Sequence, residues 1–185
     1  MSNIILFNLM TVDGFFEGPN REIDWHNVDD EFNDFAIEQL NSASALVFGR
    51  ITYELMAAYW PSSEASINDP VVAGKMNSIQ KIVFSRTLDK AGWNNTRLVK
   101  GDPEEEFRKL KQIYDKDIFI FGSADLASTL MNRSLINEYR IIVNPIILGQ
   151  GNTLFKPSGK RLKLCLIKVR TFKSGNVLLY YQPEN

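Results

Sequence analysis

The sequence predicts one α/β domain built on a mixed β-sheet, and three observations lead to this prediction. Short apolar runs alternate with helix-like patterns from one end of the chain to the other. No repeat, low-complexity tract or Pro/Gly/Ser-rich linker divides the 185 residues, so a single domain over residues 1–185 is expected. After residue 135 two apolar runs flank a turn-like segment, Lys173 to Asn176, which is typical of an antiparallel hairpin. We therefore expect a sheet that is parallel first and antiparallel last.

The strands are expected where short apolar runs are bounded by glycine, proline or polar residues. These runs are Ile4 to Leu9, Ala45 to Phe48, Lys81 to Ser85, Arg97 to Val99, Asp117 to Phe121, Glu138 to Val143, Leu162 to Thr171 and Val177 to Gln182. The first five are expected to be parallel and buried, because they lack a clear polar face and alternate with helical segments.

The helices are expected between these runs, where apolar residues recur at helical spacing. They are Asp29 to Asn41, Asp69 to Asn77, Pro103 to Tyr114 and Ser123 to Met131. Asp102 is a suitable N-cap for the third of them, and Pro103 suits its first turn. A further helix begins directly after Gly49.

The composition argues against several classes of partner and site. With 21 Lys plus Arg against 22 Asp plus Glu, the net charge of −1 provides no broad positive field for nucleic acid or an anionic membrane. The one cysteine, Cys165, cannot form an internal disulfide, and the one histidine, His26, cannot build a His-rich metal site. The first apolar run meets Asp13 long before the roughly 20 residues of a membrane span. We therefore expect a cytoplasmic protein with a metal-free site.

The most informative segment is the strand Ala45 to Phe48, which stops at Gly49 and turns directly into a helix. Free backbone N–H groups and the positive end of the helix dipole point outward at such a junction, and glycine lets an anion approach closely. Arg50 and Thr52 add guanidinium and hydroxyl donors. The segment predicts a phosphate site, and an ordinary helix start with a surface arginine is the open alternative.

Two further strand ends carry the same kind of signal. Gly122 and Ser123 end one strand and open a helix, so two helix starts could hold one diphosphate. A third strand ends in Ser85 and Arg86, where Arg86 either pairs with a ribose 2′-phosphate or lies solvated in a loop. The sequence contains no G-x-G-x-x-G fingerprint followed by an acidic residue, so a different nucleotide-binding architecture is expected.

Taken in order, these segments resemble the dihydrofolate reductase fold, and more closely the reductase domain of bacterial bifunctional riboflavin-biosynthesis deaminase-reductases and its stand-alone relatives. The similar segments are Leu9 to Phe16, Gly49 to Glu54, Phe84 to Leu88, Phe121 to Ala124, and Leu135 to Arg140 leading to Pro145 to Gly151. The resemblance covers nearly the whole chain. It implies a three-layer fold, with a mixed, mostly parallel sheet of about eight strands between helices, and frequently a homodimer. No His/Cys zinc constellation of a fused deaminase is present.

The resemblance also implies NADPH as the cofactor of a reductase. The residues that it places on the cofactor are Gly49, Arg50, Ile51 and Thr52 on the phosphates, Ser85 and Arg86 near the 2′-phosphate, and Gly122, Ser123, Ala124, Asp125 and Leu126 around the diphosphate. The implied substrate is a pteridine-like or ribosylaminopyrimidine-like heterocycle that accepts hydride at a C=N or C=O group. The nicotinamide would supply the chemistry, and the protein would supply orientation and a dry site.

Two acidic positions are candidates for catalysis. In the resembling enzymes the loop after the first strand closes over the nicotinamide, which makes Asp13 a candidate, although Asp13 before Gly14 is also a strong turn signal. True dihydrofolate reductases need one acid on the first helix. Asp30, Asp34 and Glu38 lie four apart on one helical face, so spacing does not choose among them, and they also fit a solvated face. Asp34 is our candidate.

The substrate side is less defined. Trp25 resembles the tryptophan near the pterin and also fits a buried anchor, while Tyr53 could stack on a flat heterocycle or fill the core. Leu148 and Gly149 belong to a glycine-rich loop that lies near the substrate in the resembling enzymes, and this loop also fits a plain turn. Because the proton donor is undefined, a noncatalytic nucleotide-binding or dimeric scaffold protein is the alternative function.

Overall fold

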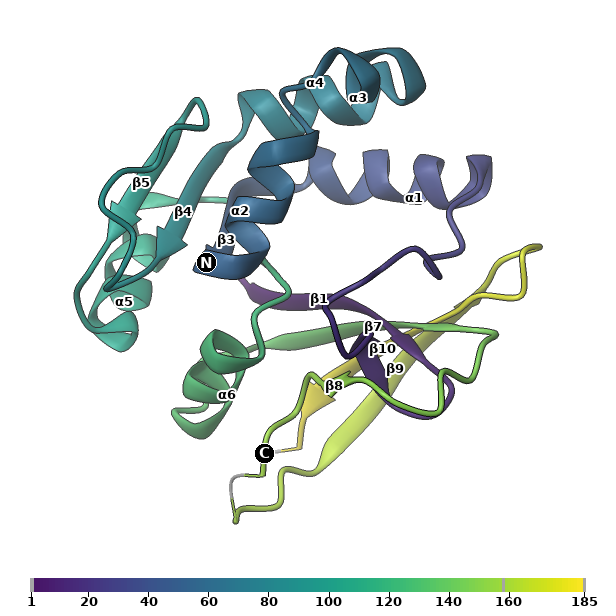
Figure 1. Cartoon of the computed structure of the whole chain (residues 1–185). Helices are drawn as coiled ribbons and strands as arrows, with labels where there is room; N and C mark the ends of the chain where they lie inside the picture. The colour runs from purple at the N-terminus through teal and green to yellow at the C-terminus, as the bar shows by residue number, and fades with distance from the viewer. Residues whose placement is uncertain (1, 158, 185) are drawn as a thin grey trace.

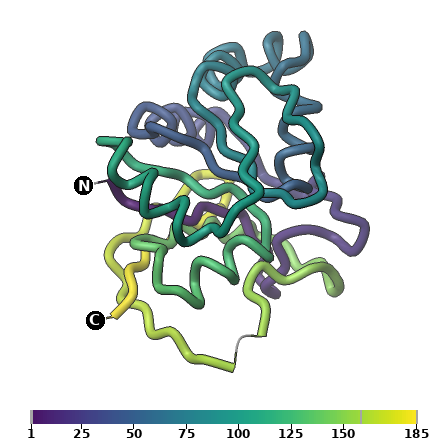
Figure 2. The backbone as a smooth tube through the Cα atoms, turned by 90° about the vertical axis from the view of Figure 1, so that its left-hand side faces the viewer, coloured from purple at the N-terminus to yellow at the C-terminus, as the bar shows by residue number. Residues whose placement is uncertain are grey.

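The computed structural model describes residues 2–157 and 159–184, which form three layers with one large sheet in the middle (Figure 1). The sheet has eight strands in the order β5-β4-β3-β6-β1-β7-β10-β9. Their bounds are β1 (Ile4–Thr11), β3 (Ala43–Gly49), β4 (Gln80–Phe84), β5 (Thr96–Val99), β6 (Asp117–Phe121), β7 (Glu138–Asn144), β9 (Leu164–Thr171) and β10 (Val177–Pro183). A separate two-stranded sheet joins β2 (Phe15–Glu17) to β8 (Asn152–Thr153). Figure 2 shows both ends of the chain on the same side of the molecule.

The mixed character of the sheet is confirmed. Strands β5, β4, β3, β6, β1 and β7 are parallel neighbours, and β10 runs antiparallel to both β7 and β9. The expectation that the first five strands are all buried is wrong for β5, since Arg97 is exposed and only Val99 is fully buried. The reason is position: β5 lies at the edge of the sheet, where one side of the strand meets solvent.

The described residues form six helices. They are α1 (Asp30–Asn41), α2 (Arg50–Tyr59), α3 (Ser63–Asn68), α4 (Pro70–Ser78), α5 (Pro103–Ile113) and α6 (Ala124–Asn132). Five of them cover the two faces of the large sheet, while α3 packs against α4. Asp102 caps α5 as expected, accepting a hydrogen bond from the Glu104 N–H at 2.8 Å. The sequence patterns did not predict α3, β2 or β8, which have six, three and two residues and are too short to show a period.

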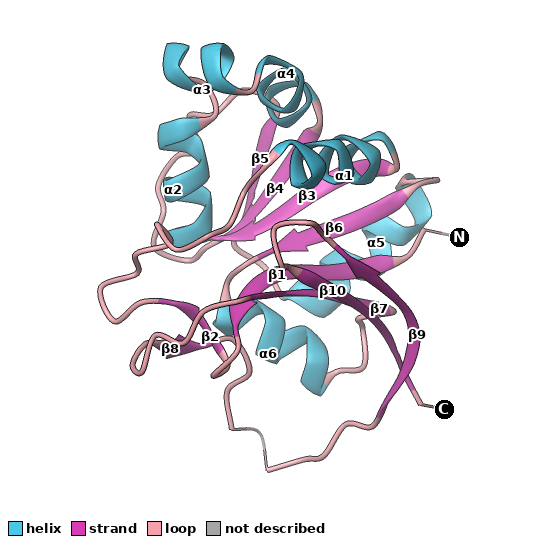
Figure 3. Cartoon of the chain, turned by 90° about the vertical axis from the view of Figure 1, so that its right-hand side faces the viewer, coloured by secondary structure: helices cyan, strands magenta, loops and turns pink. Residues whose placement is uncertain are grey.

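Alternate residues of the central strand β1 face two separate cores. Ile4 and Leu6 pack with Phe107 of α5 and Leu130 of α6. Ile5, Phe7 and Leu9 pack in the other core, with residues of α1, α2 and α4. Figure 3 shows the two groups of helices on opposite sides of the sheet. The two-residue side-chain period of a strand therefore produces the three layers.

Strand β4 carries a fully buried lysine, Lys81, behind the end of helix α4. Its ammonium donates hydrogen bonds to the carbonyl oxygens of Met76 at 2.8 Å, Asn77 at 3.1 Å and Ile79 at 2.8 Å. These carbonyls belong to the last turn of α4 and the residue after it, so Lys81 satisfies acceptors that a helix C-terminus leaves open. Burial lowers the pKa of Lys81 to about 8. The contact ties the start of β4 to the end of α4.

Asparagines join the loop before α1 to the tip of the β9–β10 hairpin. The Asn27 N–H donates to Asn144 Oδ1 at 2.9 Å, and Asn176 Nδ2 donates to the Asn27 carbonyl at 2.7 Å. The neighbouring side chain, His26, is mostly buried, and burial lowers its pKa to about 4. It is therefore neutral in the folded protein at pH 7. Among the described residues, no helix has both the length and the apolar character needed to span a membrane.

Lys81→Met tests the role of the buried ammonium. The variant removes the ammonium donor from the Met76 and Ile79 carbonyls, while the Asn77 carbonyl keeps the Asn95 side chain as a donor. It should therefore lower the free energy of unfolding by about 2 to 4 kcal/mol. Lys75→Met is the matched control, because Lys75 lies on the same helix end but is only half-buried, with Asn41 as its partner. Urea unfolding followed by circular dichroism measures both. Equal stability of the two variants would contradict this role.

His26→Gln tests the buried imidazole through pH. The unfolded chain takes up a proton near pH 6.5 and the folded protein only near pH 4, so the wild type loses stability as the pH falls through this window. The loss should be about 2 to 3 kcal/mol larger than in His26→Gln. Urea midpoints at pH 7.5, 5.5 and 4.5 measure the difference, and the carboxylates common to both proteins cancel. Parallel pH profiles would show that His26 is not buried as a neutral group.

Candidate functional site

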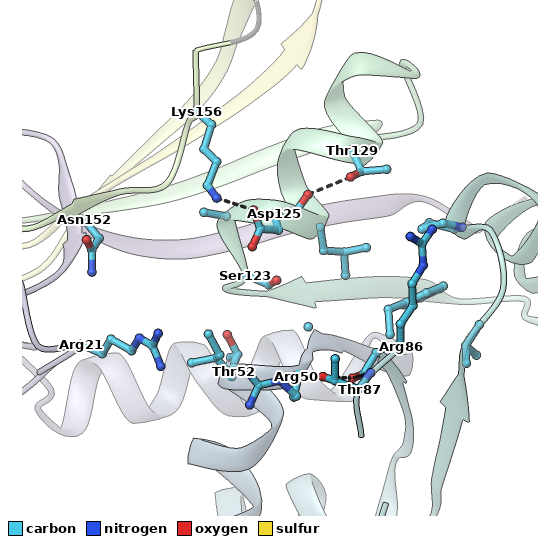
Figure 4. A pocket seen from close by; sticks show the side chains of 18 of the residues that line it. Arg21, Arg50, Thr52, Arg86, Thr87, Ser123, Asp125, Thr129, Asn152 and Lys156 are labelled. Atoms are coloured by element: carbon cyan, nitrogen blue, oxygen red, sulfur yellow. Dashed lines mark hydrogen bonds and ion pairs between the residues drawn. The ribbon is translucent and has the colours of Figure 1, made fainter. Parts of the chain in front are cut away.

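The principal cavity of the described structure lies where the parallel strands β3, β4 and β6 end (Figure 4). Its volume is about 690 Å³. Carboxyl ends of parallel strands meet at one edge of a sheet, which is where open α/β sheets bind ligands. A residue at or just after the end of each strand lines the cavity: Gly49, the last residue of β3, Ser85 after β4 and Ser123 after β6. The three polar strand ends noted in the sequence are therefore brought to one place.

The ends of β3 and β6 fit together through two glycines. The strands are direct neighbours, with Phe48 opposite Phe121. A Cβ atom on Gly49 would lie 2.0 Å from the Ser123 hydroxyl oxygen, and one on Gly122 would lie 2.6 Å from the Thr52 hydroxyl oxygen. Gly122 also has φ +60°, a conformation that favours glycine. Each glycine thus makes room for a hydroxyl side chain of the other strand end, in addition to any ligand.

Two helices begin at this contact, and both present free donors. The N-cap of α2 is Gly49, which has no side chain, and the N-cap of α6 is Ser123, whose hydroxyl makes no capping hydrogen bond. The first-turn N–H groups of both helices therefore lack a side-chain partner at their N-caps. Uncapped N–H groups and the positive ends of two helix dipoles form a site for an anion with more than one phosphate.

The side chains around the cavity add positive charge. Five cations line it, against two carboxylates, although the whole chain carries a net charge of −1. The cations are Arg21, Arg50, Arg86, Lys100 and Lys156, and the carboxylates are Glu17 and Asp125. Arg86 and Lys100 follow the neighbouring strands β4 and β5, so they lie at one end of the cavity. In Figure 4 Arg86 and Lys156 lie on opposite sides of the opening.

Most residues predicted for the cofactor line this cavity. They are Gly49, Arg50, Ile51, Thr52, Ser85, Arg86, Ser123, Ala124, Asp125 and Leu126. Gly122 is buried behind them against Thr52. Sequence reasoning missed three cations of the cavity, Arg21, Lys100 and Lys156. Lys100 could have been found as the first residue after a predicted strand, but Arg21 and Lys156 lie in loops that no motif marks.

The small sheet of β2 and β8 closes one side of the cavity. Phe16 and Glu17 of β2 and Asn152 and Thr153 of β8 line it. Asn152 Nδ2 donates to Glu17 Oε1 at 2.8 Å, which joins the two strands beyond their backbone pairing. The segment after β1 thus forms one wall of the cavity, with apolar and polar side chains.

Asp13 lies outside this cavity and joins two loops. Its carboxylate accepts hydrogen bonds from the Thr11 hydroxyl at 2.6 Å and from the Gly149 N–H at 2.8 Å. A third donor is the Leu148 N–H at 3.3 Å. The Thr11 hydrogen bond, with the two backbone donors, lowers the pKa of Asp13. A carboxyl with a lowered pKa stays ionised at neutral pH and accepts hydrogen bonds, so Asp13 orients the loop that carries Leu148 and Gly149.

Asp34 belongs to an acidic surface on α1. It is exposed, and with Asp29, Asp30 and Glu31 it lines a separate hollow of about 450 Å³ that also contacts Lys173. Glu31 Oε2 accepts a hydrogen bond from the Lys173 N–H at 2.9 Å. The described residues contain no group of three or more His, Cys, Asp or Glu arranged to hold a metal ion.

The two aromatic candidates lie in the core that contains α1 and α2. Tyr53 is 3% exposed, and its hydroxyl oxygen accepts a hydrogen bond from the backbone N–H of Trp93 at 2.9 Å. Trp25 packs against the same core, with its ring 4.5 Å from the ring of His26, and its indole N–H has no partner in the described structure. Neither aromatic side chain lines the principal cavity.

Comparisons with known proteins show the family and the fold of the chain. The family model described as the RibD C-terminal domain matches residues 2–178. An uncharacterized protein of Bacillus subtilis, YyaP, is 36% identical over 180 residues, which are 96% of this chain and 93% of that protein. A protein from Shewanella sp. PV-4 that is assigned to riboflavin biosynthesis has a TM-score of 0.76 at 22% identity, covering 99% of each chain.

Two more distant structures show the same fold. The Thermotoga maritima diaminohydroxyphosphoribosylaminopyrimidine deaminase/5-amino-6-(5-phosphoribosylamino)uracil reductase has a TM-score of 0.70 at 16% identity, covering 99% of this chain and 57% of that one. Dihydrofolate reductase of Enterococcus faecalis, solved with NADP(H), has a TM-score of 0.65 at 14% identity, and the match covers 99% of this chain and 97% of that one. The fold is dihydrofolate reductase-like, and the chain belongs to the RibD C-terminal domain family.

Proposed function

We propose that this protein is a cytoplasmic, NADPH-dependent reductase of a pteridine-like or ribosylaminopyrimidine-like heterocycle. The observation that carries the proposal is the cavity in which two uncapped helix N-termini meet five cations. Membership of the RibD C-terminal domain family supports a reductase-type function. The names of the Thermotoga and Enterococcus proteins, a uracil reductase and a dihydrofolate reductase with NADP(H), support the substrate class and the cofactor.

The donor set of the cavity fits a dinucleotide with an extra phosphate. The first turns of α2 and α6 would hold the diphosphate, with Arg50 and the Thr52 hydroxyl beside it. Arg86 and Lys100, which have no ion pair among the described residues, would hold the 2′-phosphate, because a guanidinium forms paired hydrogen bonds with phosphate oxygens. The Ser85 hydroxyl oxygen accepts a hydrogen bond from the Leu88 N–H at 2.9 Å. This contact holds the loop after β4 in a turn, with Arg86 at the cavity.

When bound, NADPH supplies the hydride. The chain's own residues orient the cofactor between β3 and β6 and exclude water with the wall of β2 and β8. The Asp13 contact with Leu148 and Gly149 fixes the loop beside that wall. Asp13 and Asp34 remain our candidates for catalysis, and Trp25, Leu148 and Gly149 remain our candidates on the substrate side. Tyr53 is not retained, because its ring is buried in the core and its hydroxyl is bonded to the Trp93 backbone.

A noncatalytic nucleotide-binding protein is the second candidate. The observation that favours it is the position of the acids: Asp13 and Asp34 lie outside the cavity, and the carboxylates that line it are Glu17 and Asp125. The two functions share the binding step and differ in turnover, so one set of experiments separates them.

We further propose that the protein is a homodimer that associates through β9. Four apolar side chains of this edge strand are 37% to 57% exposed: Leu164, Leu166, Ile167 and Val169. No described residue of β9 belongs to either buried core. A row of exposed apolar residues on an edge strand is typical of an interface.

The family resemblance, which implies a homodimer, favours a second copy as the partner of β9. Residues 156–173 contain seven Lys or Arg and no Asp or Glu, whereas residues 13–38 contain nine Asp or Glu and Arg21 as their one Lys or Arg. In the folded chain these two segments already meet, since Arg170 of β9 forms an ion pair with Glu38 of α1 at 3.0 Å. The exposed apolar side chains of β9 are therefore the proposed contact between the two copies.

Arg86→Ala tests cofactor binding. It removes one charged hydrogen-bonding group from the proposed 2′-phosphate site, so the Kd for NADPH should rise about tenfold while binding of NADH changes little. Quenching of tryptophan fluorescence measures both constants. Arg97→Ala is the control, because Arg97 lies on the next strand, pairs with Glu106 and does not line the cavity. Absence of NADPH binding by the wild type would refute the proposed cofactor.

The same protein tests turnover. Loss of nicotinamide absorbance with a panel of dihydropteridines and ribosylaminopyrimidines is the expected result for the reductase. Tight NADPH binding without turnover of any panel member would instead favour the noncatalytic protein.

Leu166→Glu with Val169→Glu tests the dimer. Light scattering should give twice the chain mass of 21.1 kDa for the wild type and the single mass for this double variant. Ile113→Glu, on α5 and 69% exposed, is the control and should stay dimeric. Cys165 is exposed on β9, so a bifunctional thiol reagent should join two wild-type copies. A monomeric wild type, or an unchanged mass in the double variant, contradicts the proposal.

A further inference from the structure

An acidic side chain, Asp125, lies within the proposed phosphate site. It is the second residue of α6, its side chain is 84% exposed, and it lines the cavity. The positive end of a helix dipole attracts a carboxylate as it attracts a phosphate. Asp125 and a ligand phosphate therefore compete for the same positive potential, and their negative charges repel one another.

Lys156 neutralises this carboxylate. Its ammonium forms an ion pair with Asp125 Oδ1 from the segment between β8 and β9, on the far side of the cavity from α2 (Figure 4). Arg50 has its partner, Glu54, on its own helix and outside the cavity lining. Among the described residues, the Asp125–Lys156 pair is therefore the one ion pair that joins two lining side chains. The other lining cations have no ion pair there: Arg21, Arg86 and Lys100.

We propose that Asp125 is a built-in competitor for the ligand phosphate, and that Lys156 exchanges Asp125 for a phosphate oxygen when the ligand binds. The Asp125 side chain is largely exposed and that of Lys156 is about half exposed, so the pair is weak and can open at little cost. Asp125 can turn into solvent, while Lys156 stays over the N-terminus of α6. The exchange lowers the affinity below the value that the helix N-termini and cations would otherwise provide. It also brings the β8–β9 segment to the bound ligand.

The proposal rests on the proposed function only in that the cavity binds a diphosphate. It differs from two other roles that a carboxylate could have here. If Asp125 accepted a hydrogen bond from a ribose hydroxyl, its loss would weaken binding. If the ion pair only stiffened the loop, loss of either partner would have the same effect.

The test is a double-mutant cycle with Asp125→Asn, Lys156→Met and the combined variant. NADPH is titrated by tryptophan fluorescence, and inorganic pyrophosphate is titrated by calorimetry. Asp125→Asn should tighten binding of both ligands about threefold to tenfold, because it removes a repulsion and releases Lys156. Lys156→Met should weaken binding, and it should do so more in the Asp125→Asn background than in the wild type. Only the exchange of partners predicts that the two single variants change the affinity in opposite directions and that the effect of Lys156→Met depends on Asp125.

Lys163 and Glu184 supply the matched control. They form an ion pair with an N···O distance of 3.5 Å, Lys163 belongs to the same basic segment, and neither residue lines the cavity. Lys163→Met and Glu184→Gln change the net charge exactly as the test variants do, and they should leave both affinities unchanged. This comparison separates a local effect from the general charge of the protein.

The outcomes distinguish this proposal from the proposed function. If the wild type binds neither NADPH nor pyrophosphate, the phosphate site and the exchange both fail. If the wild type binds them but Asp125→Asn binds equally or more weakly, the exchange alone is overturned. Tighter binding by Asp125→Asn together with equal tightening by Glu184→Gln also overturns it, since the effect would then be one of net charge.

Discussion

The close packing of two parallel strand ends, β3 and β6, is the constraint on which the site depends. Gly49 lies against the Ser123 hydroxyl and Gly122 against the Thr52 hydroxyl, with no room for a Cβ atom at either glycine. Because each strand continues directly into a helix, this contact brings the N-termini of α2 and α6 to one cavity. The backbone donors at the two helix N-termini are thus held in place by a sheet with a core on each face. The cationic side chains that line the cavity add to the anion site formed by these backbone N–H groups.

The distribution of charge explains how a nearly neutral chain can offer a site for a polyanion. The net charge is −1, yet five cations and two carboxylates line one cavity. The five cations come from separate parts of the chain, and the fold gathers them at this cavity, apart from most of the acids. Segregation of this kind produces a strong local potential and leaves the field at long range weak. A small net charge therefore argues against a broad nucleic-acid surface but has no bearing on a phosphate pocket.

Much of the fold was predictable because it follows from local rules. The apolar runs marked all eight strands of the large sheet, and the hairpin after residue 160 showed that the sheet is mixed. The glycine at each strand-to-helix junction marked the two helix starts, since few other residues suit that geometry. The shortest elements, α3, β2 and β8, left no period to detect. Sequence spacing also could not decide whether Tyr53 faces a ligand or the core, because the partner of its hydroxyl, Trp93, lies 40 residues away.

The sequence by itself determined the alternation of strands and helices, the two glycine junctions and the position of Arg86 at a strand end. Each depends on residues within one turn or one strand of each other. Only the tertiary structure decided which cations share the cavity, since Arg21, Lys100 and Lys156 come from three separate segments. It also decided that the carboxylate of Asp13 joins two loops, through a contact with Gly149 across 136 residues. Such contacts depend on the order of the strands in the sheet. Strand order is set by the packing of the whole domain, so a local sequence pattern does not reveal it.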